Sequence, residues 1–129
     1  MKVVAKATVF FSVSILAVFN PLKHNIVGHW KIFVPPGMNV SEYVELRKDG
    51  SYNVYVNDKV EERGFYTVKN SVFSIRNVKP VCGDGYWGKY KLDFYGSDSV
   101  HFTLIDDSCS NRRMDIVGVN PGLRRLKDN

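Results

Sequence analysis

Hydrophobic and polar residues alternate along most of this chain, which is the pattern of half-buried β-strands. In the clearest stretch Gly88, Tyr90, Leu92 and Phe94 share one face, and mostly charged residues occupy the other. Seven further short segments show the same alternation or short apolar runs, and no helical periodicity is found after residue 25. The pattern predicts strands near 27–34, 41–47, 51–58, 62–69, 72–78, 86–95, 99–107 and 112–118.

Three short turns set the register of these strands independently. Residues 48–50 form a three-residue hairpin loop with Gly50 in the left-handed position, residues 70–71 form a two-residue turn, and residues 96–98 form a third turn. Each turn places the apolar residues of both strands on one face, as a correct register requires. The predicted pairs are Val44 with Val54, Leu46 with Tyr52, Val68 with Phe73, Phe94 with Val100, and Leu92 with Phe102.

The links between the predicted strands are short, so neighbouring strands should pair antiparallel. One face of the sheet is apolar throughout and no predicted helix covers it, so the sheet must close on itself or fold into a sandwich. Eight strands close into a barrel whose interior is just filled by side chains or holds one small ligand. We therefore predict an all-β, eight-stranded antiparallel up-and-down β-barrel.

The N-terminal segment has the layout of a secretory signal peptide. Lys2 and Lys6 make a basic start, an uncharged run of 13 residues follows from Ala7 to Phe19, and Asn20-Pro21 ends it. The run is too short to span a bilayer comfortably, although a retained N-terminal anchor is the alternative. We predict a cleavable leader over 1–20, a barrel domain over 24–122 and a basic tail over 123–129, with a secreted or periplasmic location and no membrane span in the mature form.

Charge adds little to this picture. The chain carries +5 at pH 7, and loss of Lys2 and Lys6 reduces 18 basic residues to 16 against 13 acidic ones, which leaves +3. Arg124, Arg125 and Lys127 form the only basic cluster, which is a solvated tail or, alternatively, a phosphate or membrane site. Nucleic-acid binding would need clustered Lys and Arg, so we expect no nucleic-acid partner and a monomer.

The two cysteines, Cys82 and Cys109, predict a disulfide in an exported chain. They lie at the open end of the same hairpin, offset by about three residues, and the intervening loop could absorb the offset. Two free buried thiols in a cytosolic protein are the alternative.

Gly28-His29-Trp30 on the first of eight strands resembles the lipocalin signature. The resemblance implies that Trp30 plugs the closed end of the barrel beside Gly28, and that Arg112 or Arg113, late in the chain, packs across it. A second pattern resembles short exported bacterial lipocalin-like domains, with a Cys before a Gly-x-Tyr strand and then Asp-x-Cys-x-x-Arg. Its residues here are Cys82, Gly88, Tyr90, Asp107, Cys109 and Arg112.

The chain departs from typical lipocalins in length and in two elements. It is shorter, and we predict neither the C-terminal helix beside the barrel nor the second motif between the sixth and seventh strands. Shorter strands imply a smaller barrel and so a smaller ligand pocket.

Residues that carry catalytic or metal chemistry are scarce. His24, His29 and His101 lack metal-ligand spacing with one another or with Cys and carboxylates. Asp106 and Asp107 are adjacent, so on a strand they face opposite sides, and a cap or a partner for Arg112 is the simplest role. We therefore expect no enzyme activity, no catalytic residues, no metal and no cofactor.

Aromatic residues are the enriched class, with 7 Tyr, 8 Phe and 2 Trp. Inward aromatics serve either as a solid core or as the lining of a pocket, where the hydroxyls of Tyr66 and Tyr90 would bond a ligand. The predicted function is binding of a small hydrophobic or amphipathic ligand inside the barrel. The alternative is a protein-binding module, such as an inhibitor of an exported hydrolase, that uses the outward Tyr55, Trp87 and Tyr95. The predicted ligand-binding residues are Tyr52, Val54, Tyr66, Tyr90, Phe94 and Phe102.

Overall fold

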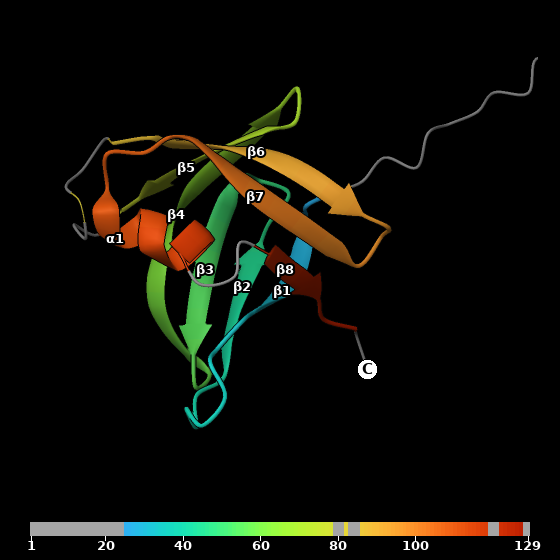
Figure 1. The fold of residues 1–129 in the computed structure, drawn as a ribbon, viewed down its shortest axis with the longest axis vertical. Coiled ribbons are helices and arrows are strands. Elements are labelled where there is room, and N and C mark those ends of the chain that lie inside the picture. The colour runs from blue at the N-terminus through green and yellow to red at the C-terminus, as the bar shows by residue number, and fades with distance from the viewer. Residues whose placement is uncertain (1–24, 79–81, 83–85, 119–121, 128–129) are drawn as a thin grey trace, which may run out of the picture.

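Eight antiparallel strands close into one barrel in chain order, and the last strand returns to pair with the first (Figure 1). The computed structural model describes residues 25–78, 82, 86–118 and 122–127, so the predicted leader lies outside the described residues. The prediction of an eight-stranded antiparallel up-and-down barrel is confirmed. The strands are β1 (Gly28–Ile32), β2 (Glu42–Leu46), β3 (Ser51–Val56), β4 (Lys59–Lys69), β5 (Val72–Asn77), β6 (Gly88–Tyr95), β7 (Ser99–Asp106) and β8 (Gly122–Arg125).

The turns give the registers that the sequence predicts. Gly50 adopts a φ of 87°, in the left-handed region that glycine enters without steric cost. Asn70 and Ser71 adopt φ values of 51° and 62°, as a two-residue hairpin turn with the strand's own twist requires. The five predicted pairs, including Val44 with Val54 and Leu92 with Phe102, are all present.

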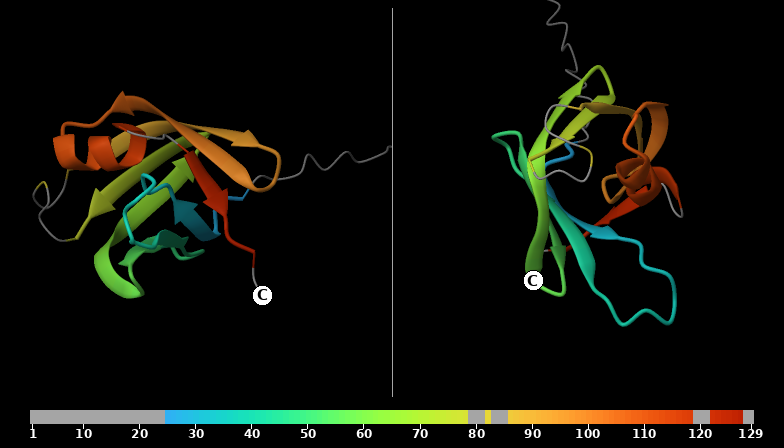
Figure 2. Two further views of the ribbon diagram at one scale, coloured as in Figure 1. Left: turned by 60° about the horizontal axis from the view of Figure 1, so that its bottom comes forward. Right: turned by 90° about the vertical axis from the view of Figure 1, so that its left-hand side faces the viewer.

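The predicted eighth strand at 112–118 is wrong, because this segment is helical. It consists of α1 (Ser110–Arg113) and the π-helical turn η1 (Met114–Gly118), which lie across the barrel from β3 and β4 (Figure 2). The strand that closes the barrel is β8, which starts within one residue of the segment predicted to be a tail. Its inward positions are Leu123 and Arg125, and because Arg125 is charged, the strand lacks the apolar alternation that marks the others.

The core fills the closed part of the barrel with aromatic and aliphatic side chains. Trp30, Tyr52, Tyr90 and Val100 are the most deeply buried large residues. Phe73 packs between Tyr66 and Phe102, with ring centroids 5.7 Å and 5.2 Å apart respectively. Tyr90 of β6 meets Phe102 edge-on at 6.4 Å, so these rings link β4, β5, β6 and β7 around one apolar interior.

A disulfide joins Cys82 and Cys109, whose Cα atoms lie 5.5 Å apart, as the sequence predicts. Cys109 stands at the N-terminal end of α1, so the bridge ties this short helix to the segment that precedes β6. No helix within the described residues has the length and apolar character needed to cross a membrane.

Candidate functional site

Trp30 is fully buried on β1, and Arg125 from β8 covers it. The guanidinium carbon of Arg125 lies 4.2 Å from the centre of the Trp30 ring, within cation–π range. The indole Nε1 of Trp30 donates to the carbonyl oxygen of Ile26 at 2.8 Å. Arg125 also donates to the carbonyl oxygens of Val27 at 2.9 Å and Asn25 at 2.6 Å, so it ties the segment before β1 to the last strand.

The glycine of the Gly28-x-Trp30 motif leaves room for this same arginine. A Cβ at Gly28 would lie 2.7 Å from Nη1 of Arg125, and the backbone φ of 137° is itself one that side chains disfavour. The prediction that Arg112 or Arg113 covers Trp30 is therefore wrong. The arginine that does so lies in a strand whose place in the barrel the alternation pattern missed.

Arg112 instead forms a buried ion pair with Asp107. Its Nε and Nη2 atoms donate to the two carboxylate oxygens at 2.8 Å and 2.7 Å, which is a bidentate geometry. The side chains of Arg112 and Asp107 are 3% and 0% exposed, so the pair is removed from water. Arg112 was the partner predicted for one of the two adjacent aspartates, and that prediction is confirmed.

The residues of the second sequence pattern gather around this ion pair. Tyr90 donates its hydroxyl hydrogen to Asp107, and the backbone N–H of Cys109 donates to the same carboxylate at 2.9 Å. A Cβ at Gly88 would collide with Asp107, so the glycine makes room for it. Burial alone would raise the pKa of Asp107, but the hydrogen bonds from Arg112, Tyr90 and Cys109 outweigh it and hold that pKa below its usual value.

A chain of polar contacts leads from this pair into the barrel interior. Arg112 donates from Nη1 to the Asn77 side-chain oxygen at 2.9 Å, and the Asn77 amide donates to Glu62 Oε1. Tyr52 donates its hydroxyl to the same oxygen of Glu62 at 3.2 Å. This series of hydrogen bonds therefore ends on the carboxylate of Glu62, which lines a cavity.

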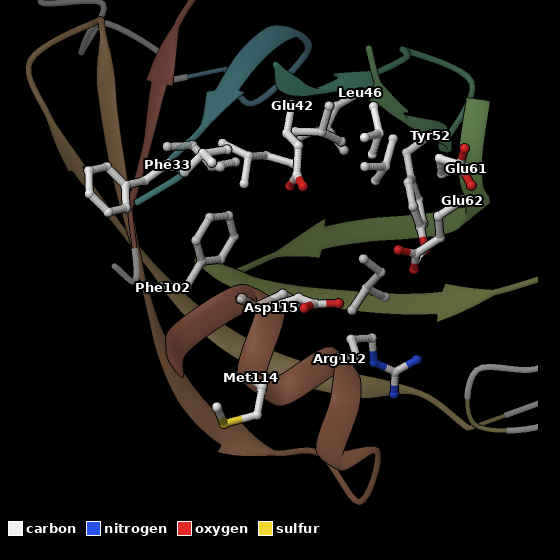
Figure 3. Close-up of a pocket in the computed structure, with 18 of the residues that line it drawn as sticks. Phe33, Glu42, Leu46, Tyr52, Glu61, Glu62, Phe102, Arg112, Met114 and Asp115 are labelled. Atoms are coloured by element: carbon white, nitrogen blue, oxygen red, sulfur yellow. Dashed lines mark hydrogen bonds between the residues drawn. The ribbon is translucent and has the colours of Figure 1, made fainter. Parts of the chain in front are cut away.

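The cavity has a volume of about 410 Å³ and lies inside the barrel between β1–β3 and the helical turn η1 (Figure 3). Protein pockets for small ligands usually measure about 300–1,000 Å³. Its walls are mainly aliphatic and aromatic, and Phe33, Met38 and Met114 remain exposed at 45%, 59% and 61%. The other lining residues are Ile32, Val34, Pro35, Glu42, Val44, Leu46, Tyr52, Val54, Val56, Glu61, Glu62, Phe73, Ile75, Phe102, Arg112, Asp115, Ile116 and Leu123.

The structure divides the six predicted ligand-binding residues into two groups. Tyr52, Val54 and Phe102 line the cavity. Tyr66 and Tyr90 do not line it, and their hydroxyls are already bonded to the carbonyl of Arg47 and to Asp107. Phe94 is not among the lining residues either. The sequence argument rested on hydroxyls in need of a buried partner, and the protein itself supplies those partners.

Sequence reasoning missed the acidic side chains of the cavity. Glu42 from β2, Glu62 from β4 and Asp115 from η1 point into the same space in Figure 3. Burial raises the pKa of Glu62 above its ordinary value; the hydrogen bond from Tyr52 opposes this rise, and the nearby Asp115 adds to it. Burial also raises the pKa of Asp115. Glu42 shares the inward face of β2 with Val44 and Leu46, so strand parity could have identified it. Asp115 could not be identified in this way, because its segment is predicted as a strand and is helical.

Within the described part of the chain, no group of three His, Cys, Asp or Glu side chains is placed to hold a metal ion. The fold and cavity define a small closed antiparallel β-barrel with one wall completed by a helical turn. No protein-family model, no curated protein and no solved structure matches this chain.

Proposed function

We propose that this barrel binds a small amphipathic molecule in its interior cavity and has no catalytic activity of its own. The observation that carries the proposal is the apolar-walled cavity of about 410 Å³, which opens beside exposed Phe33, Met38 and Met114. A cavity of this kind provides burial for the apolar part of a ligand, while carboxylates at one side provide contacts for a polar part.

A lipocalin-like relationship is part of this proposal. It is supported by the closed eight-stranded barrel and by the placement of Gly28 and Trp30 on the first strand beneath an arginine from the last. Export is a further part, supported by the Cys82–Cys109 disulfide, which persists in oxidising compartments.

Binding of an uncharged fluorescent probe tests the proposal directly. N-phenyl-1-naphthylamine fluoresces strongly only in apolar surroundings, so titration of the protein should give a saturable signal with one site per chain. Val54→Phe fills the cavity wall and should abolish or strongly weaken binding, because added carbon atoms occupy the ligand's space. Val60→Phe makes the same change at an exposed position of β4, where 51% of the residue is accessible, and should leave binding unchanged.

Both variants must melt cooperatively for the comparison to count, since overpacking a core costs about 1–3 kcal/mol. Val56→Phe offers a second filling of the same cavity if Val54→Phe fails to fold. A folded wild-type protein that gives no saturable signal, or a signal equal in all variants, would contradict an interior binding site.

The outer face of β4–β6 offers a second candidate function, as a protein-binding surface. The guanidinium of Arg76 lies 5.4 Å from the Phe65 ring centre and 5.3 Å from that of Trp87, and both rings are about two-fifths exposed. Tyr95 does not extend this surface, because it stands at the other end of β6, about 26 Å away at the usual rise per residue. This surface becomes the better proposal if the cavity proves empty of any ligand.

A further inference from the structure

Four acidic side chains line the cavity, namely Glu42, Glu61, Glu62 and Asp115. Glu42, Glu62 and Asp115 point into its interior, and Arg112 is the one cation among the described lining residues. Among the described residues, no hydrogen-bond donor or ion-pair partner reaches the carboxylates of Glu42 and Asp115. Glu62 accepts hydrogen bonds from Tyr52 and Asn77, both on Oε1, which leaves Oε2 without a donor from the described part of the chain. These three side chains come from β2, β4 and η1, so the closure of the barrel is what brings them together (Figure 3).

Arg112 also lines the cavity and its charge lowers the pKa of Glu62, but its three guanidinium nitrogens already donate to other residues. It is bound to Asp107 through two hydrogen bonds and to Asn77 through a third. The cavity therefore has acidic character inside a chain whose formal net charge is +5. A cavity lined by carboxylates favours a positively charged ligand, even though the whole molecule is basic.

An unpaired carboxylate that loses part of its hydration is unfavourable, and neighbouring carboxylates make it more so. Burial raises the pKa of both Glu62 and Asp115, and the charge of Asp115 adds to the rise at Glu62. A cation bound between them would remove the repulsion and replace the lost hydration. The site is thus arranged to gain free energy from a positively charged group.

The apolar walls and the carboxylate spacing decide which cation fits. In the described residues no three acidic, His or Cys side chains converge closely enough for a metal ion. The cavity is much larger than an ion, and Val54, Phe73 and Phe102 give it an apolar wall. An organic cation satisfies both features, because an ammonium group reaches the carboxylates while its hydrocarbon part covers the wall.

We propose that the ligand of this barrel is an amphipathic amine, with its protonated nitrogen between Glu62 and Asp115 and its apolar body against β1–β3. This proposal rests on the proposed interior binding function and specifies its ligand class. Each ammonium–carboxylate hydrogen bond in such a site is charge-assisted and so contributes more than a neutral one.

Three probes with one hydrocarbon chain and different head groups test this proposal. Octylamine, octanol and octanoate are used at pH 7.5 to displace N-phenyl-1-naphthylamine from the wild-type protein. Octylamine should bind about tenfold or more tightly than octanol, and octanoate should bind most weakly, because its charge repels the carboxylates. Equal binding of octylamine and octanol, or tightest binding of octanoate, overturns the amine proposal while interior binding stands. Failure of all three probes and of the fluorescent probe itself overturns both proposals.

Variants of the carboxylates show which residues cause the preference for octylamine over octanol. Glu62→Gln keeps the side-chain oxygen that accepts from Tyr52 and Asn77 and removes the charge, and Asp115→Asn removes the second charge. The double variant should lose about tenfold or more in octylamine affinity and keep its octanol affinity. Asp106→Asn removes an exposed carboxylate that does not line the cavity and should change neither. Unchanged octylamine affinity in the folded double variant would overturn the proposed contact.

Discussion

The barrel carries acidic groups in two regions, one buried around Asp107 and one at the cavity, and the two are built differently. Asp107 is enclosed by a bidentate arginine, a tyrosine hydroxyl and a backbone N–H, and no buried side-chain polar atom within the described residues is left without a partner. Glu42 and Asp115 face the cavity with no donor from the described chain. A carboxylate with all its partners in the protein is part of the scaffold, whereas one that faces a cavity without partners is available to a ligand.

The largest expected effect is loss of the arginine in the first region. Arg112→Leu leaves Asp107 buried and unpaired, so the free energy of unfolding should fall by about 3–5 kcal/mol in urea denaturation. Arg113→Leu changes the neighbouring residue, which makes one hydrogen bond to the Asp107 carbonyl, and should cost about 1 kcal/mol. If the free energy of unfolding falls by the same small amount in both variants, Arg112 is not what stabilises the charge of Asp107.

Arg125 offers an intermediate effect away from either acidic region. Arg125→Met removes the cation–π contact over Trp30 and the hydrogen bonds to Asn25 and Val27, and should cost about 1–3 kcal/mol. Arg124→Met on the same strand affects an exposed side chain and should change stability by less than about 0.5 kcal/mol. If both variants melt alike, Arg125 does not stabilise the Trp30 end of the barrel.

In the cavity region, neutralising a carboxylate should change the free energy of unfolding little. Glu62→Gln keeps the acceptor for Tyr52 and Asn77, so the free energy of unfolding at pH 7 should stay within about 0.5 kcal/mol of wild type or rise. This is the opposite of the result expected for Arg112. A loss comparable to that of Arg112→Leu would place Glu62 in the scaffold rather than at a ligand site.

The smallest expected effect is a difference in pH dependence between the two regions. The raised pKa of Glu62 means that the folded state holds its proton longer than the unfolded state, so ionisation lowers stability as pH rises from about 4 through that raised pKa. The lowered pKa of Asp107 has the reverse sign, and its contribution is lost as pH falls below about 4. Urea midpoints between pH 3 and pH 7 should show the first slope in wild type and a smaller slope in Glu62→Gln, where Asp115, whose pKa is also raised, still contributes. The acid loss should appear in both proteins.

Features that depend on local sequence patterns could be predicted, whereas those that depend on closure of the barrel could not. The seven strands with clear alternation, their hairpin registers and the Cys82–Cys109 bridge depend on local patterns and turn residues, so they are readable from the chain. The eighth strand was missed because Arg125 occupies an inward position, where a pattern search expects an apolar residue. Its partner Trp30 was identified, but an arginine nearly one hundred residues away is placed only by the closure of the barrel.

The cavity side chains were harder to predict for a similar reason. Tyr52, Val54 and Phe102 follow from strand parity, and the structure places them at the cavity wall. Tyr66 and Tyr90 face inward as predicted, but strand parity does not reveal that Arg47 and Asp107 already accept their hydroxyl hydrogens. Asp115 reaches the cavity from a helical turn, so no strand pattern could place it beside Glu62.

The structure of the protein with octylamine bound, by crystallography or by NMR contacts, tests the central claim most directly. We expect the nitrogen to lie within about 3 Å of carboxylate oxygens of Glu62 and Asp115, with the alkyl chain against Val54 and Phe102. The Asp107–Arg112 pair should remain as it is in the free protein. An alkyl chain bound outside the barrel, or an amine inside that avoids both carboxylates, would contradict the account.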